Sequence, residues 1–356
     1  MINLKKNLFL ILSLILVISI SACGRSSGSK KSIEEIRTGT QGISLTFLPN
    51  NPPDVVHAEP RYNTFDITME LRNNGAYPQP DENNELGLNV YLSGFDPNIL
   101  QIKPKERTTD IISSLQGKST INPYGGLDLL SFQGTIDLSK LNVEKYEPTL
   151  MATACYNYET TAGPQVCIDP DPYSEIKTKK VCEVQDIKLS SQGAPVAVTE
   201  IAEEALAEKT RFKITVKNVG NGDVLTREAI NKMCNPNVGE KGKKIGREDV
   251  DRVELVGAYI ANEPLLCGPF VNIVEEKTGI IRLMNGEGFV ICKLEKGGQN
   301  GYSQYAKSST SFTTPLVVKI RYGYRNTVQR KLIIKKEAGA TMPDIPGSIP
   351  REYEYT

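Results

Sequence analysis

The chain has 356 residues with 42 basic and 42 acidic side chains, so its net charge is zero and no basic excess points to nucleic acid as a partner. A single histidine and the lack of any Cys-x-x-Cys spacing argue against a zinc site. The length favours two domains.

The N-terminus has the three parts of an export signal. Two lysines near the start precede an apolar run over residues 8–20, and the small residues Ser21 and Ala22 follow it. The run is too short to span a bilayer, which takes about 20 apolar residues. We therefore expect residues 1–22 to be a cleaved signal peptide.

Residues 20–23, Ile-Ser-Ala-Cys, resemble a prokaryotic lipobox, the motif whose cysteine becomes the lipidated first residue of the mature chain. Two acyl chains, at about 0.8 kcal/mol for each buried CH₂, would hold the protein stably on a membrane. We expect a lipid on Cys23 that anchors the chain at the extracytoplasmic face of the cell membrane. An uncleaved anchor and plain secretion are the alternatives. Residues 23–41, rich in Ser, Gly and Lys, would form a flexible tether.

An even number of cysteines remains beyond Cys23, which favours disulfides in an exported chain. They are Cys155, Cys167, Cys182, Cys234, Cys267 and Cys292.

A repeated stretch near the middle and the end of the chain indicates a duplicated domain. The sequence PTLMATACYNYE at 148–159 matches TPLVVKIRYGYR at 314–325 with an offset of 166 residues. The same offset carries residues 166–168 onto 332–334 without a gap, so two strands and the turn between them are expected to recur.

A second match lies earlier in each half. TFDITMELRNNG at 64–75 resembles RFKITVKNVG at 211–220, with Phe65 aligned to Phe212, and each ends in an Asn/Gly turn. The alternation of apolar and polar residues has the period of a half-buried strand.

Short alternating segments separated by turn residues predict an all-β fold of two tandem antiparallel sandwiches, over 42–176 and 177–337. The expected strands of the first are 43–48, 64–71, 87–93, 127–136, 150–158 and 165–168. Those of the second are 195–200, 212–217, 253–260, 280–284, 288–293, 314–322 and 328–335. Short helices are expected at 203–209 and 226–233, and residues 338–356 form a Pro/Gly-rich tail.

The signature ITVKNVGNGD at 214–223 resembles tandem immunoglobulin-like domains of the CARDB and surface-layer-associated type. GTQGISLTFLPNNPPD at 39–54 and VYLSGFDPN at 90–98 are similar to pieces of archaeal surface lipoproteins with this two-domain plan. The resemblance spans about residues 39–336. It implies immunoglobulin-like sandwiches at a cell surface, and it implies no catalytic chemistry.

The repeat places Cys155 and Cys167 on the last two strands of the first domain. A hairpin centred on Thr161 would bring them opposite each other, which suits disulfide geometry. For the remaining four cysteines we expect the pairs Cys182–Cys234 and Cys267–Cys292.

No catalytic or metal-binding set stands out. His57 lies in a Pro-rich stretch without a placed nucleophile, and MNGEGF at 284–289 is typical of a tight turn rather than a phosphate loop. No cofactor is expected. Asp169, Asp171 and Glu175 leave a calcium site open, although no known calcium-loop pattern matches and a solvated Pro-rich linker explains them better.

Two features remain as candidates for binding. The repeated Tyr-x-Tyr at 156–158 and 322–324 is better explained by strand packing than by an aromatic binding strip. Residues 221–251 form a long insertion that the first half lacks, and long loops on a rigid scaffold often carry function. Its charges are balanced, and Lys241, Lys243 and Lys244 are the candidate partner contacts.

These observations favour a non-enzymatic, membrane-anchored surface lipoprotein that acts in envelope structure, adhesion or protein–protein interaction. Its expected partners are the membrane, through the lipid on Cys23, and an envelope or surface protein, with self-association also open. The alternatives are an accessory subunit of a pilus, secretion or other membrane assembly, and an enzyme or receptor with an unrecognised site.

Overall fold

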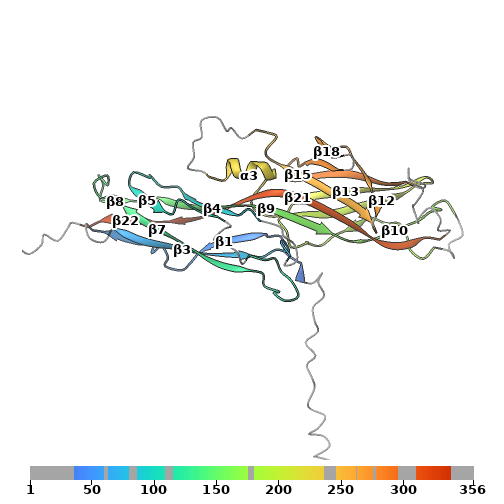
Figure 1. Cartoon of the computed structure of the whole chain (residues 1–356). Helices are drawn as coiled ribbons and strands as arrows, with labels where there is room; N and C mark the ends of the chain where they lie inside the picture. The colour runs from blue at the N-terminus through green and yellow to red at the C-terminus, as the bar shows by residue number, and fades with distance from the viewer. Residues whose placement is uncertain are drawn as a thin grey trace, which may run out of the picture. The chain divides into compact units, whose positions relative to one another are not determined.

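The computed structural model describes residues 36–59, 63–79, 86–108, 115–174, 180–235, 246–261, 263–275, 278–295 and 310–337, all within one compact unit. The described part is all-β, with 56% of its residues in strands of several mostly antiparallel sheets, which confirms the predicted class (Figure 1). In these ranges no helix has the length and apolar character needed to cross a membrane. The predicted signal peptide, Cys23 and the C-terminal tail lie outside the described residues.

One sheet runs through both halves of the sequence. Its strand order is β18 (Ile273–Glu275), β19 (Thr278–Arg282), β15 (Arg252–Ile260), β21 (Phe312–Lys331), β9 (Thr149–Ala162), β4 (Asn89–Ser93) and β6 (Glu106–Thr108). Strands β10 (Gln165–Ile168) and β14 (Asp223–Leu225) also pair with β21, and β16 (Glu263–Pro264) pairs with β15.

Three smaller sheets complete the fold. The first is β1 (Ile43–Phe47), β3 (Thr64–Asn73), β7 (Leu127–Ile136) and β5 (Leu100–Lys103). The second is β11 (Ile187–Lys188), β12 (Val196–Ala205), β13 (Lys209–Asn218), β20 (Glu287–Glu295) and β17 (Leu266–Gly268). The third is β2 (Val55–Ala58), β22 (Ile333–Lys336) and β8 (Lys145–Tyr146).

Alternating side chains hold these layers together. In β3, Ile67, Met69 and Leu71 are fully buried, whereas the residues between them face outward. They belong to the same buried cluster as the inward side chains of β9, β13 and β21. Each such side chain contributes roughly 1.5–3 kcal/mol when buried, so the alternation read from the sequence largely fixes which face of each strand packs.

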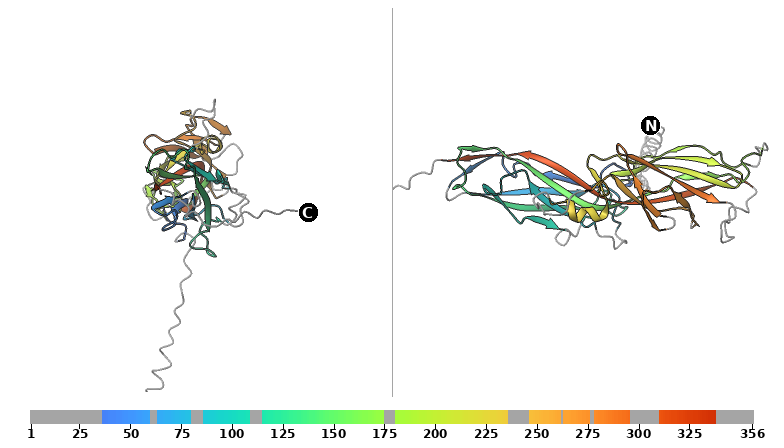
Figure 2. Two further views of the ribbon diagram at one scale, coloured as in Figure 1. Left: turned by 90° about the vertical axis from the view of Figure 1, so that its left-hand side faces the viewer. Right: turned by 90° about the horizontal axis from the view of Figure 1, so that it is seen from above.

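Strands β9 and β21 each leave their own half and enter the other. Strand β9 begins beside β4, but β10, which follows it, pairs with the start of β21, with Ile168 opposite Phe312. Strand β21 begins beside β15, but β22, which follows it, pairs with β8, with Ile334 opposite Tyr146. The repeat offset of 166 carries Ile168 onto Ile334 and Tyr146 onto Phe312, so the second pair is the equivalent of the first. The two halves therefore exchange their terminal strands reciprocally. Figure 2 shows β9 in green and β21 in red passing in opposite directions.

This exchange corrects the predicted hairpin between 150–158 and 165–168. Strand β10 does not turn back on β9, because it pairs with β21. In the second copy no turn occurs at all at the matching position, and β21 continues to Lys331. Each end of the fold therefore contains strands from both halves of the sequence, residues before and residues after the boundary expected at 176/177.

The structure confirms several other predicted strands, helices and turns and contradicts one of them. The expected strands 127–136 and 165–168 are confirmed by β7 and β10, and the helix expected at 226–233 is α3 (Arg227–Met233). The helix expected at 203–209 is wrong, because β12 turns there into β13. The tight turn in MNGEGF is confirmed by positive φ at Asn285 and Gly286, which suits a two-residue hairpin.

Candidate functional site: a disulfide-anchored insertion at the strand-exchange seam

We call the pairing of β9 with β21, residues 149–162 with 318–331, the seam. Its register places Tyr156 opposite Tyr324, Asn157 opposite Gly323 and Tyr158 opposite Tyr322. Residues 157 and 323 are also equivalent in the repeat. A local two-fold axis therefore passes between them, and the seam has the self-complementary form of a symmetric dimer interface.

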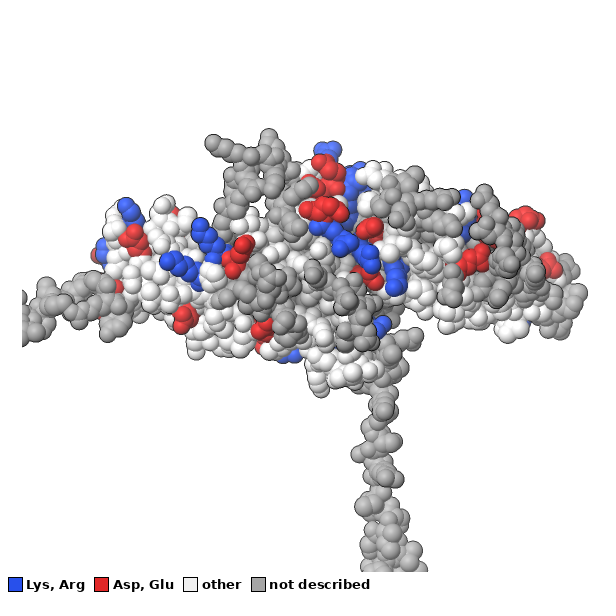
Figure 3. Space-filling model, in the orientation of Figure 1, with Lys and Arg blue, Asp and Glu red and all other residues white. Residues whose placement is uncertain are grey.

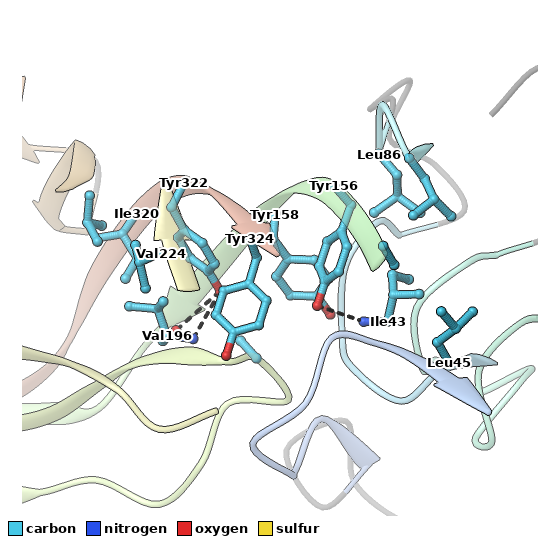
Figure 4. Close-up of a cluster of buried hydrophobic side chains, with 14 of the residues drawn as sticks. Ile43, Leu45, Leu86, Tyr156, Tyr158, Val196, Val224, Ile320, Tyr322 and Tyr324 are labelled. Atoms are coloured by element: carbon cyan, nitrogen blue, oxygen red, sulfur yellow. Dashed lines mark hydrogen bonds between the residues drawn. The ribbon is translucent and has the colours of Figure 1, made fainter. Parts of the chain in front are cut away.

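Four tyrosines fill one face of the seam (Figure 4). All four are at most 3% exposed, and neighbouring ring centroids lie 5.8–6.4 Å apart. The Tyr156 hydroxyl accepts the Ile43 N–H at 3.1 Å, and the Tyr322 hydroxyl accepts the Val196 N–H at 3.2 Å. These two contacts are equivalent in the repeat. Each one binds the first residue of a strand, Ile43 of β1 or Val196 of β12, to the seam.

The other two tyrosines bind the turns that follow β3 and β13. The Tyr158 hydroxyl accepts the Tyr77 N–H at 3.2 Å, and the Tyr324 hydroxyl accepts the Gly222 N–H at 2.7 Å. These packing roles follow the expectation for Tyr-x-Tyr. Burial raises the pKa of Tyr324 to about 12 and the pKa of Tyr158 further, so these hydroxyls stay neutral.

Asn73 and Asn218 shape these two turns in the same way. The Asn73 amide donates to the Tyr77 carbonyl at 2.7 Å, and the Asn218 amide donates to the Gly222 carbonyl at 2.9 Å. Asn73 and Asn218 are therefore structural equivalents, 145 residues apart. The alignment of Phe65 with Phe212 is two residues out of register with this pairing, although it preserves which face of the strand is buried.

The opposite face of the seam carries α3. Gly323 is required there, because a Cβ would overlap the Ile230 side chain and the Thr226 carbonyl. The Thr226 hydroxyl caps the helix by accepting the Ala229 N–H at 3.3 Å. The helix buries its apolar side in a small cluster: Tyr91, Cys155, Leu225, Ala229, Ile230 and Cys234.

A disulfide joins α3 to the seam and corrects the expected pairing. Cys155 bonds Cys234, with Cα atoms 5.7 Å apart, so neither Cys155–Cys167 nor Cys182–Cys234 forms. Cys155 faces away from the tyrosines as expected, but that face is covered by α3 rather than by a hairpin partner.

The other two disulfides lie in the second-half end of the fold. Cys167 bonds Cys182, with Cα atoms 5.8 Å apart. Strand β10 lies against the start of β21, and the Cys182 N–H donates to Oγ of Ser311, directly before β21, at 3.4 Å. Cys267–Cys292 is confirmed, and its cysteines are directly opposite on β17 and β20.

The insertion, residues 221–251, is fastened at both ends. Asp223 accepts from Nε and Nη2 of Arg325 at 3.0 and 2.8 Å, and the Thr226 N–H donates to the Asp249 carbonyl at 2.9 Å. Leu225 forms a β-bridge with Val250. The candidate contacts Lys241, Lys243 and Lys244 lie between these fastened ends, outside the described residues.

Charges on the same face of the seam are paired. Arg321 Nε donates to Glu159 Oε2 at 2.7 Å, and this bond raises the pKa of Arg321. Figure 3 shows basic and acidic side chains intermixed on the described part of the visible face. Neither sign of charge dominates the described part of this face.

The histidine and the acidic residues singled out in the sequence do not form one site with the insertion. His57 is an exposed residue of β2, with Nδ1 2.5 Å from Glu337 Oε1. Asp169 is buried, pairs with Lys180 at 2.8 Å and accepts the Asp171 N–H. Among the described residues, no group of three or more His, Cys, Asp or Glu side chains could hold a metal ion. Glu175 lies outside them.

Glu203 is a buried carboxyl group that sequence reasoning missed. Its Oε2 accepts the Cys167 N–H at 3.2 Å, and burial raises its pKa to about 7. The signal in the sequence is its place two residues after buried Ile201 in an alternating strand, which the helix-forming composition of 203–209 conceals.

The chain matches no protein-family model, and no curated protein is significantly similar to it.

Proposed function

We propose that this chain is a lipid-anchored, non-enzymatic protein of the extracytoplasmic face, and that its insertion contacts another envelope or surface protein. Three disulfides indicate an oxidising, extracytoplasmic location for the fold. The lipobox-like sequence ending at Cys23 supports the anchor. The immunoglobulin-like resemblance supports a scaffold role at a surface.

The observation that carries the proposal is the Cys155–Cys234 bond. It fixes the base of a long, otherwise unrepeated loop to the seam, where β9 pairs with β21. Fixing a loop before it binds lowers the ordering cost that binding must overcome. A tolerated surface excursion does not need such an attachment.

The N-terminal segment meets the seam on the face opposite to α3, so an anchored tether would leave α3, at the base of the insertion, accessible. The Gly39 N–H donates to Ser191 Oγ at 2.8 Å, and Gly193, which accepts from the Tyr158 hydroxyl, donates to the Gly39 carbonyl at 3.0 Å. Residue 39 thus meets the seam on its tyrosine face, whereas α3 lies on the opposite face. In Figure 1, β1 and α3 lie on opposite sides of β9 and β21.

The anchor is tested first. Cys23→Ser should release the protein from the membrane fraction into the soluble extracytoplasmic fraction or the medium, with loss of metabolic lipid labelling. Retention of the variant in the membrane fraction would contradict the anchor, and leave the contact to be judged separately.

The contact is tested by the triple substitution of Lys241, Lys243 and Lys244 to Ala. After crosslinking of intact cells, we expect this variant to lose the protein that wild type recovers. The matched control replaces three lysines elsewhere, the exposed Lys103, Lys140 and Lys188, and should recover it fully. Equal recovery by both variants would contradict the contact. Recovery of pilus or secretion components would instead favour an accessory subunit.

A further inference from the structure

We propose that the seam is also a self-association surface. The strand exchange that closes within one chain can close between two copies of it, and two disulfides, Cys155–Cys234 and Cys167–Cys182, keep it within one chain.

The seam has the geometry that a second copy requires. Each pair along it joins a first-half residue to a second-half residue, from Thr149 opposite Lys331 to Ala162 opposite Val318. These ladder bonds and the tyrosine contacts do not depend on which chain supplies each half. The first half of one copy can therefore meet the second half of another with every contact preserved, in a two-fold dimer.

A disulfide and an ion pair join the two ends of the connection between the halves. It leaves β10 after Ile168 and enters β11 at Ile187. Cys167 bonds Cys182, and Asp169 pairs with Lys180 at 2.8 Å, with the Asp169 side chain 8% exposed. Twelve residues, 169–180, span at most about 40 Å when extended. The Cys167–Cys182 bond and the Asp169–Lys180 pair, rather than the length of the connection, therefore keep its two ends together.

The three disulfides differ in what they connect. Cys155–Cys234 joins the first half to the second across the seam, and Cys167–Cys182 closes the connection between them. Cys267–Cys292 joins β17 to β20, both in the second half. In a strand-exchanged dimer the first two bonds would link different chains, whereas the third would stay within one chain. Cys267–Cys292 therefore serves as an internal control for exchange between chains.

The experiment uses the purified full chain, half of it uniformly labelled with ¹⁵N. Equal amounts of labelled and unlabelled chain are reduced, unfolded, refolded together at rising protein concentration, oxidised and mapped by mass spectrometry without reduction. We expect mixed-isotope Cys155–Cys234 and Cys167–Cys182 peptides to increase with concentration toward about half, the limit for random pairing in two-fold dimers. Cys267–Cys292 should stay unmixed. Unmixed Cys155–Cys234 at every concentration would overturn the proposal, and so would equal mixing of all three bonds.

The locking role is tested by removing bonds. The fourfold variant Cys155→Ser, Cys167→Ser, Cys182→Ser and Cys234→Ser should form a concentration-dependent dimer in size-exclusion chromatography with light scattering. The Cys267→Ser/Cys292→Ser variant should stay monomeric. A folded fourfold variant that stays monomeric would overturn the locking role. If that variant does not fold, the isotope experiment decides the proposal alone.

Discussion

The two halves of the molecule are alike on one face of the seam and different on the other. On the tyrosine face, the Tyr156 hydroxyl contact with a strand N–H is repeated by Tyr322. The turns that follow β3 and β13 are bound in the same way, by Tyr158 and Tyr324. On the other face, the central pair is Asn157 and Gly323. The repeated contacts stabilise the fold, whereas the unrepeated face is free to carry a role of its own.

The central pair shows how one substitution separates the halves. Gly323 admits α3, because a Cβ there would overlap the helix. Asn157 instead meets a short backbone segment, and its N–H donates to the Leu86 carbonyl at 2.6 Å. The two halves thus differ at the point where the second half has room for the helix that begins its insertion.

The seam disulfide should give the largest effect on stability. Replacing Cys155 and Cys234 by Ala opens a 79-residue link and should lower the free energy of unfolding by about 4–5 kcal/mol, because loop closure costs more for longer loops. Replacing Cys267 and Cys292, which are 25 residues apart, should cost about 3–4 kcal/mol. Urea unfolding of the two variants measures both. A smaller loss at the seam would mean that α3 is not fixed there.

The equivalence of the two turns is tested by two glycines. A Cβ on Gly75 would overlap the Tyr158 hydroxyl, and a Cβ on Gly220 would overlap the Tyr324 hydroxyl. Gly75→Ala and Gly220→Ala should each lower the free energy of unfolding by about 2–3 kcal/mol, as overpacking does. Gly163→Ala is the matched control, since its Cβ meets nothing within 4 Å. Thermal unfolding that ranks Gly163→Ala with the other two would break the equivalence.

The buried hydroxyls make a third, smaller pair. Tyr156→Phe and Tyr322→Phe each leave one strand N–H without its acceptor, and each should cost about 1–3 kcal/mol. The Tyr322 hydroxyl also lies 2.9 Å from the Thr160 hydroxyl, so we expect Tyr322→Phe to lose at least as much stability in urea as Tyr156→Phe. A smaller loss for Tyr322→Phe than for Tyr156→Phe would contradict this account of the two contacts.

These tyrosines also predict an alkaline limit. Burial raises the pKa of both Tyr156 and Tyr322 well above the value of about 10 in unfolded chains. Their contribution is therefore complete below pH 10 and is lost as pH rises above it, because the unfolded state ionises first. In urea unfolding at a series of pH values, either Phe variant should lose stability less steeply above pH 10 than wild type.

A pH-dependent effect is expected at Glu203, whose contact with the Cys167 N–H joins the two halves. Its pKa is raised to about 7 by burial, so the stability that its neutral form provides is present below about pH 4.5 and is lost as pH rises toward 7. Glu203→Gln keeps an oxygen for the Cys167 N–H and should be more stable than wild type at pH 8, but not at pH 4. Equal gains at both pH values in thermal unfolding would contradict this assignment.

The sequence predicted faces of strands better than their partners. Alternation placed Tyr156 and Tyr158 inward and Cys155 outward, because side-chain period depends only on the strand itself. It did not reveal that β10 pairs with β21, since a strand with the same alternation can pair within its own half or across the seam. The wrong Cys155–Cys167 pair follows from that one missing fact.

Local composition misled at one place for a different reason. Residues 203–209, EEALAEK, are strong helix formers, yet β12 and β13 pair there as a hairpin, with Glu203 opposite Phe212. Tertiary pairing overrode intrinsic propensity, which is a weak prior for so short a segment. For the insertion, composition indicated a long loop but could not indicate that Cys234 fixes it to Cys155.

Peptide mapping of the purified, unreduced protein tests the central claim most directly. Reciprocal strand exchange with an anchored insertion predicts Cys155 linked to Cys234, Cys167 to Cys182 and Cys267 to Cys292. A Cys155–Cys167 link would mean that β9 and β10 fold back as a hairpin within the first half, and would contradict both the exchange and the anchored insertion.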